Sequence, residues 1–477
     1  MRFLTLTHRW MGVVLCLFFA AWFFSGAVLI YHPFPSLSQA VRLSHSSGVD
    51  LQKILIPPYE AVKSAENLDR IRLIDLEGQP IYVLHSLDGV IKVVNASDSK
   101  FVSPLLKISA WRIAEKFSGN SALSVEGPLD YDQWIVPNRY DPYRPFFRVS
   151  MQDEKRTVLY VSTQTGEVLQ KTEGKERAWN YIGAVVHWIY PTILRSDWAL
   201  WDQVVWWLSL AGVVTTLIGL LLGVMRSRGM RDANQMGFTS PFRGWLRVHH
   251  TLGVFAGAIV LAWIFSGWLS MDHGRIFSTP NPDVIQIEKF RALPLEESVN
   301  NVSLEALKSL RNFIEVEFVT VGGKNFIVAK NTNGLKLFKP LNSNSFSQYK
   351  LTEPEIISAV QMAWPDIDIQ STQRPTASDI YGQLREGSLP QNTLRVILDD
   401  SSQTWVHIDM DSGQIVSIMD RSRRVYRWLF NGLHSLDFPG LVSHRPLWDI
   451  LILLLLALGF LFSLTGVVVG WKRLTNK

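Results

Sequence analysis

Seven histidines stand at the ends of long apolar segments, where their side chains could ligate a metal. An ionisable group at a membrane segment is costly, so its default interpretation is functional. Neutral imidazole suits iron and tolerates an apolar setting better than a charged group does. Two such rings on facing helices at one depth could therefore share a metal. The seven are His8, His32, His187, His249, His250, His273 and His434.

The stretches around these histidines occur twice. At an offset of 241 residues the matched pairs are His8/His249, Gly12/Gly253, Trp22/Trp263, Ser25/Ser266, Gly26/Gly267 and His32/His273. At an offset of 247 they are Arg148/Arg395, Thr157/Thr404, Gly166/Gly413, Arg177/Arg424, His187/His434, Trp201/Trp448, Asp202/Asp449, Gly212/Gly459 and Gly219/Gly466. The repeats predict two copies of one unit, each made of a helix, a polar domain, a histidine and a second helix. Because the offsets of 247 and 241 differ by six residues, we expect one small insertion between the halves.

Four apolar runs, at about 10–31, 204–224, 254–271 and 450–469, approach the ~20 residues that cross a bilayer core. Basic residues gather at both termini and in the short loop between the second and third runs. The positive-inside rule therefore places these parts in the cytoplasm and the two large polar segments on the outward side of the membrane. The residues are Arg2, Arg9, Arg226, Arg228, Arg231, Arg243, Arg247, Lys472, Arg473 and Lys477, against Asp232.

The net charge of +5 is then a signal of topology, and no nucleic-acid partner is expected. The first apolar run is longer than the 7–15 residues typical of a signal peptide, so we interpret it as a retained anchor. The single cysteine, Cys16, excludes an internal disulfide, a thiolate iron–sulfur cluster and covalent haem attachment through two cysteines. We expect Cys16 to be a small apolar residue of the first span.

The predicted fold is a membrane α-helical protein with four transmembrane helices, an internal duplication and two extracytoplasmic α+β domains. Strand patterns at 81–86, 90–94, 147–151 and 157–162, with counterparts at 394–398 and 404–409, alternate with amphipathic helices at 59–65 and 355–363. The boundaries are transmembrane helix 1 at 1–32, the first polar domain at 33–176, a histidine segment with helix 2 at 177–226, a cytoplasmic loop at 227–248, helix 3 at 249–273, the second polar domain at 274–423, and a histidine segment with helix 4 and a cytoplasmic tail at 424–477.

A family resemblance rests on these motifs. The strand and turn at 160–168, Y-V-x-x-x-T-G-E-V, following a helix with E-A, look like a PepSY module. Joined to spans reading H-R-W-x-G…F-S-G and V-V-H…W-D…G, it resembles the PepSY-associated transmembrane family. That family includes FoxB-like inner-membrane siderophore-iron reductases that carry haem b. The resemblance implies PepSY-like polar domains, haem b, and electron transfer to ferric siderophore iron.

The histidines at two depths would suit two haems, and hence an electron path across the membrane. His32 follows His8 by 24 residues, or roughly 36 Å of helix, so one span carries an imidazole near each surface. The preferred inner pair is His8 with His249, and His250 competes with His249. The outer site draws on His187, His434, His32 and His273, whose pairing stays open. Because four candidates exceed two axial positions, the others would contact a propionate, bind substrate iron or support the ligands.

Blander interpretations stand beside this one. A single histidine at a membrane surface often acts only as an amphipathic anchor. The PepSY modules could bind a peptidase or another envelope partner, or the chain could be a non-redox accessory protein of iron uptake. No Ser-His-Asp set, metalloprotease motif, P-loop or dinucleotide fingerprint is present, and no catalytic residue is assigned. The electron donor would be a membrane quinol or a cytoplasmic reductase. The expected partners also include membrane lipid.

Overall fold

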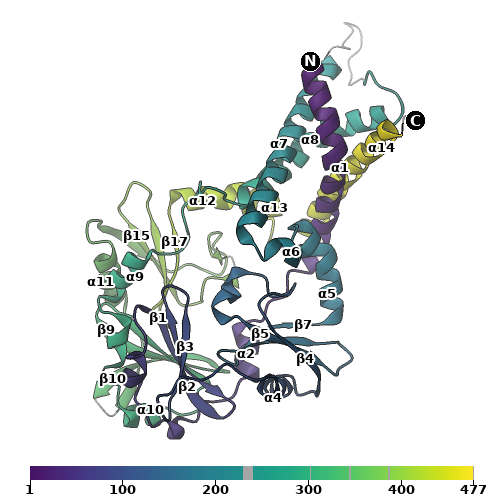
Figure 1. Ribbon diagram of the computed structural model, residues 1–477. Coiled ribbons are helices and arrows are strands. Elements are labelled where there is room, and N and C mark those ends of the chain that lie inside the picture. The colour runs from purple at the N-terminus through teal and green to yellow at the C-terminus, as the bar shows by residue number, and fades with distance from the viewer. Residues whose placement is uncertain (229–239, 301, 343–344, 385–386, 476–477) are drawn as a thin grey trace. The chain divides into compact units, whose positions relative to one another are not determined.

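The computed structural model describes residues 1–228, 240–300, 302–342, 345–384 and 387–475, so Arg231, Asp232 and Lys477 lie outside the described residues. The chain forms two compact units. One consists of Met1–Phe34, Lys175–Phe277 and Arg424–Lys477 and carries the apolar runs. The other consists of Pro35–Gly174 and Ser278–Arg423 and carries the strands. Each unit is therefore assembled from both halves of the sequence (Figure 1).

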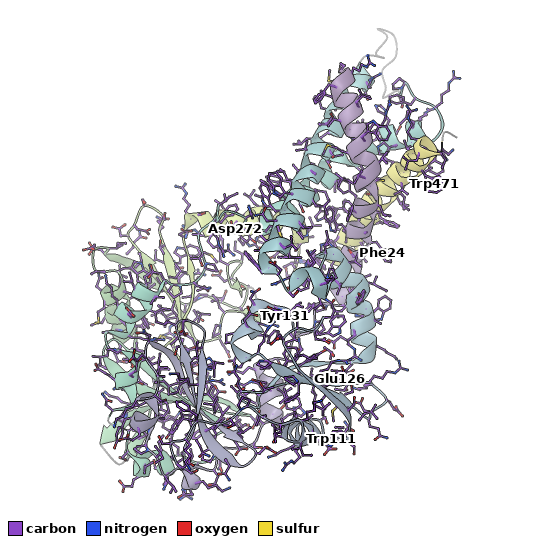
Figure 2. All side chains as sticks on the ribbon, viewed as in Figure 1. Phe24, Trp111, Glu126, Tyr131, Asp272 and Trp471 are labelled. Atoms are coloured by element: carbon purple, nitrogen blue, oxygen red, sulfur yellow. The ribbon has the colours of Figure 1, made fainter. Side chains whose placement is uncertain are left out.

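Among the described residues, the membrane unit contains four helices that are long and apolar enough to cross a membrane. They are α1 (Arg2–Tyr31), α7 (Trp198–Arg228), α8 (Gly244–Ser270) and α14 (Leu447–Leu474). Apolar side chains such as Leu17 and Phe24 stay exposed on α1, as expected for a surface that faces lipid. Figure 2 labels Phe24 on α1 and Trp471 on α14. The sequence-based prediction of four spans is confirmed.

Each long helix packs against two others. Helix α1 lies against α14 and α7, and α8 lies against the same two helices. Small residues bring the helices close: a Cβ added at Gly459 would lie 2.5 Å from the ring of Phe23, and one at Gly212 would lie 3.0 Å from Phe19. These two glycines stand at the offset of 247. The buried core between the helices includes Leu15, Phe19, Phe23, Val213, Val260, Trp263, Ile264, Ile452 and Leu456.

Short helices precede α7 and α14 in the same order. Before α7 come α5 (Gly174–Asn180), a π-helical turn at Tyr181–Val185 and α6 (Thr192–Arg195). Before α14 come α12 (Arg421–Arg427), a π-helical turn at Trp428–Gly432 and α13 (Leu433–Ser435). The two π turns stand 247 residues apart. Such turns are rare and are frequently found at functional sites.

The polar unit contains a seven-stranded antiparallel sheet to which both sequence segments contribute. Its order is β11 (Ser345–Tyr349), β10 (Gly334–Asn342), β9 (Lys324–Asn331), β8 (Glu315–Val321), β1 (Leu68–Leu76), β2 (Gln79–Ser86) and β3 (Ile91–Asn95). Strands β1 and β8 join the two segments, with Ile71 opposite Phe318. The helices α3 (Pro58–Val62) and α10 (Leu304–Ser309) and the 3₁₀ turns Leu51–Lys53 and Leu295–Val299 contribute to its buried core.

Two further antiparallel sheets each have four strands and one helix. The first contains β4 (Ala122–Leu129), β5 (Phe146–Met151), β6 (Val158–Ser162) and β7 (Val168–Thr172), with α4 (Lys107–Ser118). The second contains β12 (Ile369–Gln373), β15 (Thr393–Leu398), β16 (Trp405–Asp409) and β17 (Ile415–Met419), with α11 (Glu353–Ala363). Ala110, Ala114 and Phe117 of α4 pack on β5 and β6. The remaining elements are α2 (Gln39–His45), Asn138–Tyr143, α9 (Val284–Arg291), β13 (Gln383–Leu384) and β14 (Gly387–Ser388).

The polar unit thus has the α+β composition that the sequence predicts, but its organisation differs. The sequence analysis divides it into separate domains at 33–176 and 274–423, whereas the structure gathers both segments into one compact unit. The physical reason is the pairing of β1 with β8, since each strand would otherwise be an open edge with unpaired backbone groups.

Candidate functional site

The membrane unit brings His8 and His249 face to face. His8 lies near the start of α1 and His249 near the start of α8. Their ring centroids are 6.5 Å apart, and the ring planes are inclined by 34°. The ring of Phe462 from α14 stacks on His249 with centroids 4.9 Å apart. Three long helices therefore meet at this inner pair.

The hydrogen bonds of the inner pair assign its tautomers. Thr465 donates its hydroxyl proton to the carbonyl of Phe462 at 2.6 Å, so its oxygen accepts from Nδ1 of His249 at 2.9 Å. Nδ1 of His8 donates to the carbonyl oxygen of Thr215 at 3.0 Å. With the proton on Nδ1, the lone pair of each ring lies on Nε2. A metal-ligating histidine commonly shows this arrangement, because its second nitrogen donates to a neighbour that orients the ring.

Glycines stand beside both inner rings. A Cβ added at Gly219 of α7 would collide with Cε1 of His8 and would lie 3.0 Å from Nδ1. One added at Gly466 of α14 would lie 3.6 Å from Cε1 of His249. Gly219 and Gly466 match at the offset of 247. The missing side chains give both imidazoles room within a packed bundle.

A second pair, His187 with His434, lies near the other end of the helices. The ring centroids are 6.0 Å apart and the planes are inclined by 65°. Each histidine follows one of the π-helical turns by two residues. A Cβ at Gly26 of α1 would lie 3.2 Å from Cε1 of His187, and one at Gly267 of α8 would lie 3.4 Å from Cε1 of His434.

The outer pair has matching hydrogen bonds. Ser25 and Ser266 each donate a proton to the carbonyl oxygen three residues earlier, at 3.2 and 3.0 Å. Their oxygens therefore accept from Nδ1 of His187 at 3.2 Å and of His434 at 3.1 Å. The lone pair again lies on Nε2 in both rings. Ser25 and Ser266 are both fully buried.

Each pair would suit one bound metal. Imidazole nitrogen binds a metal at about 2 Å, so two rings that share one metal would have centroids about 6 Å apart. The observed separations are 6.5 and 6.0 Å. Among the described residues, no three His, Cys, Asp or Glu side chains gather as a metal cluster, and a porphyrin iron requires only two axial side chains.

The remaining candidate histidines make other contacts. Nε2 of His250 hydrogen-bonds to the carbonyl of Gly223 at 3.1 Å, and its ring packs against Phe242. His32 stacks on Trp179 with centroids 5.0 Å apart and an angle of 4°. His273 hydrogen-bonds through Nδ1 to the carboxylate of Asp202. Of the four outer candidates, the structure therefore brings His187 and His434 together and places His32 and His273 against other partners.

The polar unit holds a buried charge network that the sequence analysis missed. Glu317 bonds Arg70 at 2.7 Å and Lys330 at 2.6 Å, and Glu315 bonds Lys330 at 2.9 Å. Burial alone would raise the pKa of Glu317, but these cations outweigh it and lower the pKa to about 2. In the sequence this network shows only as charged residues at alternate positions of β1 and β8. That pattern is typical of an ordinary solvent-facing strand, so it did not indicate burial. The network comprises Arg42, Arg70, Arg72, Glu167, Glu315, Glu317 and Lys330.

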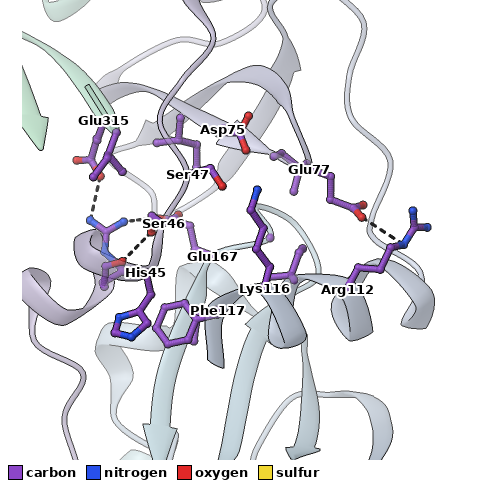
Figure 3. Close-up of a pocket in the computed structure, with 17 residues that line it drawn as sticks. His45, Ser46, Ser47, Asp75, Glu77, Arg112, Lys116, Phe117, Glu167 and Glu315 are labelled. Atoms are coloured by element: carbon purple, nitrogen blue, oxygen red, sulfur yellow. Dashed lines mark hydrogen bonds and ion pairs between the residues drawn. The ribbon is translucent and has the colours of Figure 1, made fainter. Parts of the chain in front are cut away.

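A cavity of about 360 Å³ opens beside this network in the polar unit (Figure 3). Arg42 bridges Glu167 at 3.2 Å and Glu315 at 2.9 Å at one side of the cavity. Arg112 approaches Glu77 within 3.5 Å at the other. Charges of both signs line the walls, so the cavity suits a polar occupant of mixed charge. Its charged lining residues are Arg42, Asp75, Glu77, Arg112, Lys116, Glu167 and Glu315.

A family model described as a PepSY-associated TM region matches residues 5–473. No curated protein matches the chain.

Proposed function

The chain belongs to the PepSY-associated transmembrane family, and on that premise we propose that it is an inner-membrane haem b protein that passes electrons to a periplasmic acceptor. The observation that supports this most is the presence of two facing imidazole pairs, each ring with its lone pair on Nε2. His8 and His249 would hold one haem, and His187 and His434 the other. Bound haem supplies one-electron redox chemistry at each pair.

The protein's own residues orient these ligands. Thr215, Thr465, Ser25 and Ser266 fix the ring tautomers through Nδ1. From His8 to Gly26, which touches His187, α1 advances 18 residues, or about 27 Å. The two sites thus lie near opposite faces of a bilayer core of about 30 Å. Aromatic side chains of the core, including Phe19, Phe23 and Trp263, fill the space between them.

The proposed topology has both termini in the cytoplasm and the polar unit in the periplasm. It is supported by the basic residues at the His8 end of α1 and α8 and at the end of α14. The proposed origin is a duplication of one unit. Matched π turns, matched serines beside His187 and His434, and matched glycines support it.

The proposed acceptor is ferric iron bound in a siderophore, and this iron is the substrate of the reaction. One electron converts ferric to ferrous iron, and the softer ferrous ion is held less firmly by hard oxygen ligands. The mixed-charge cavity of the polar unit is a candidate contact surface for such a polar chelate. This would make the chain an enzyme, a haem-dependent ferric siderophore reductase.

The decisive test is a redox-difference spectrum of the full-length protein, expressed with ample haem supply. We expect a bis-histidine b-type spectrum and two haems per chain. The His249→Ala variant should lose about half of the haem, whereas His250→Ala should keep it, because His250 points to Gly223. Absence of pigment from the wild-type protein would overturn the proposal and favour a PepSY membrane anchor that binds a peptidase or envelope partner.

A further inference from the structure

Asp202, His273, Trp206 and Trp268 form a cluster beside the outer histidine pair. Asp202 and Trp206 lie in the first turns of α7, Trp268 lies in the last turn of α8, and His273 follows α8. Figure 2 labels Asp272, the residue before His273. The centroid of Trp206 lies 4.9 Å from that of His273 and 5.7 Å from that of Trp268. The cluster therefore combines a carboxylate, an imidazole and two indole rings at the boundary of the span.

Its polar groups are arranged for proton transfer. Nδ1 of His273 donates to the carboxylate of Asp202, which leaves the lone pair on Nε2. Asp202 is only 4% exposed, while the side chain of His273 remains 28% exposed. A buried carboxylate behind an accessible imidazole stabilises the imidazolium that forms when Nε2 takes a proton.

Two polar atoms of the cluster are orphaned. Oδ1 of Asp202 and Nε1 of Trp268 are buried and have no hydrogen-bond partner among the described residues. Such atoms require an explanation, because an unmade hydrogen bond in a buried setting is destabilising. A ligand that accepts from the indole N–H and donates to the imidazole or carboxylate would supply the missing partners.

The equivalent place in the other half is built differently. Asp449, the counterpart of Asp202, is bound by Tyr31 at 2.8 Å and by Arg445. His32, the counterpart of His273, stacks on Trp179. The carboxylate is thus neutralised by an arginine there, and the histidine has a different partner. The carboxylate–imidazole pair is a property of one half only, so it is not required to build the bundle.

The cluster is close to the outer pair along α8. Gly267, the residue before Trp268, faces His434, since its added Cβ would lie 3.4 Å from Cε1 of that ring. The same helical turn of α8 therefore contributes to the cluster and to the packing of an outer histidine.

From these observations we propose that Asp202, His273, Trp206 and Trp268 bind the head group of a membrane hydroquinone and take its proton. The inference rests on the proposed electron-transfer function and names its electron donor. The indole rings stack on the planar head group. The Trp268 N–H donates to one ring oxygen, and a hydroxyl group of the ligand donates to Nε2 of His273.

The electrons and protons of this step balance when ferric iron is the final acceptor, as proposed above. Oxidation of one hydroquinone to the quinone breaks two O–H bonds and releases two protons and two electrons. The first proton goes to Nε2 of His273 and leaves for solvent before the second follows the same route. The two electrons reduce two ferric ions to ferrous ions, one electron each.

The test uses the full-length protein in detergent with decylubiquinone and, in parallel, a short-chain menaquinone. Anaerobic equilibrium dialysis against dithionite-reduced protein measures binding of the hydroquinone, and stopped-flow absorbance measures reduction of the haem by the quinol. We expect His273→Gln to weaken binding about tenfold and to slow reduction by the quinol about 100-fold. Asp202→Asn should slow reduction similarly, and Trp268→Phe should weaken binding. Haem content and the spectrum after dithionite should stay unchanged in all three, which shows that the variants fold.

His32→Gln and Asp449→Asn are the matched controls from the other half, and both should bind and react within about twofold of the wild type. Wild-type rates in His273→Gln and Asp202→Asn would overturn the inference, as would equal losses in His32→Gln. If the wild-type protein holds no haem, the proposed function fails. The dialysis arm then still decides whether the quinone site exists.

Discussion

The imidazole of His8 on α1 packs directly against Gly219 on α7, in the space that a side chain at position 219 would fill. A side chain at position 219 would collide with the imidazole, so the ring can sit in the bundle only because the glycine leaves room for it. The same relationship connects Gly26 with His187 and Gly267 with His434 at 3.2 and 3.4 Å. Each imidazole is therefore positioned by a hydrogen bond at Nδ1 on one side and by a missing side chain on another.

Gly219→Ala should displace His8 and remove most of the inner haem, because the added Cβ falls on the ring. Gly466→Ala, whose Cβ would lie 3.6 Å from His249, should retain more haem. The measurement is haem per chain with a low-temperature spectrum. Gly12→Ala is the control, since a Cβ there would meet none of the described atoms within 4 Å. Equal haem in Gly219→Ala and Gly12→Ala would contradict the prediction.

Ser266→Ala should loosen the outer site without destroying it. The hydroxyl that accepts from Nδ1 of His434 at 3.1 Å is lost, and losses of this kind weaken metal binding about 10–100-fold. Haem titration of the purified variant and its midpoint potential would show this. Ser270→Ala removes a hydroxyl that bonds only the carbonyl of Gly267 in the described network, and should leave both quantities unchanged.

Glu317→Ala should destabilise the polar unit strongly. The substitution leaves the buried Lys330 with one carboxylate fewer and removes the partner of the one-third exposed Arg70, and breaking a buried pair costs about 3–5 kcal/mol. Thermal unfolding of the full-length protein, followed by tryptophan fluorescence, measures the loss. The matched control is Glu353→Ala, whose ion pair with Arg374 is exposed and should be worth less than about 1 kcal/mol. An unfolding temperature unchanged in Glu317→Ala would refute the prediction.

Acid should weaken the polar unit through the same network. Glu167 and Glu317 are buried, which alone would raise each pKa, but their cation partners lower both values to about 2. A carboxyl with a lowered pKa in the folded state contributes stability above its ordinary value near 4.3. That contribution is lost as pH falls from about 4 towards 2. Unfolding midpoints measured across this range should fall more steeply in the wild type than in Glu317→Gln.

The sequence was informative where local patterns decide the structure. Run length fixed the four spans, and the repeated frame of His8 and His249 placed two imidazoles at one depth. The choice among the outer histidines could not be made in advance, because His32, His187, His273 and His434 all stand at the same end of the spans in the sequence, and only the packing of the short helices between them brings His187 and His434 together. The pairing of β1 with β8 could not be predicted from the sequence either. Which edges meet depends on contacts between residues about 247 positions apart, and no local propensity encodes them.

The β1–β8 junction has a consequence for ancestry. Ile71 lies opposite Phe318, and those positions are 247 residues apart, so under the proposed duplication each strand meets its own equivalent. Such a register is self-complementary, as in the isologous interface of a symmetric dimer. A half-length polypeptide of this design would close its open strand edge against a second copy of itself. On that proposal, two small ancestral subunits would have formed this sheet before their genes were fused, and later divergence would have made its two sides unequal.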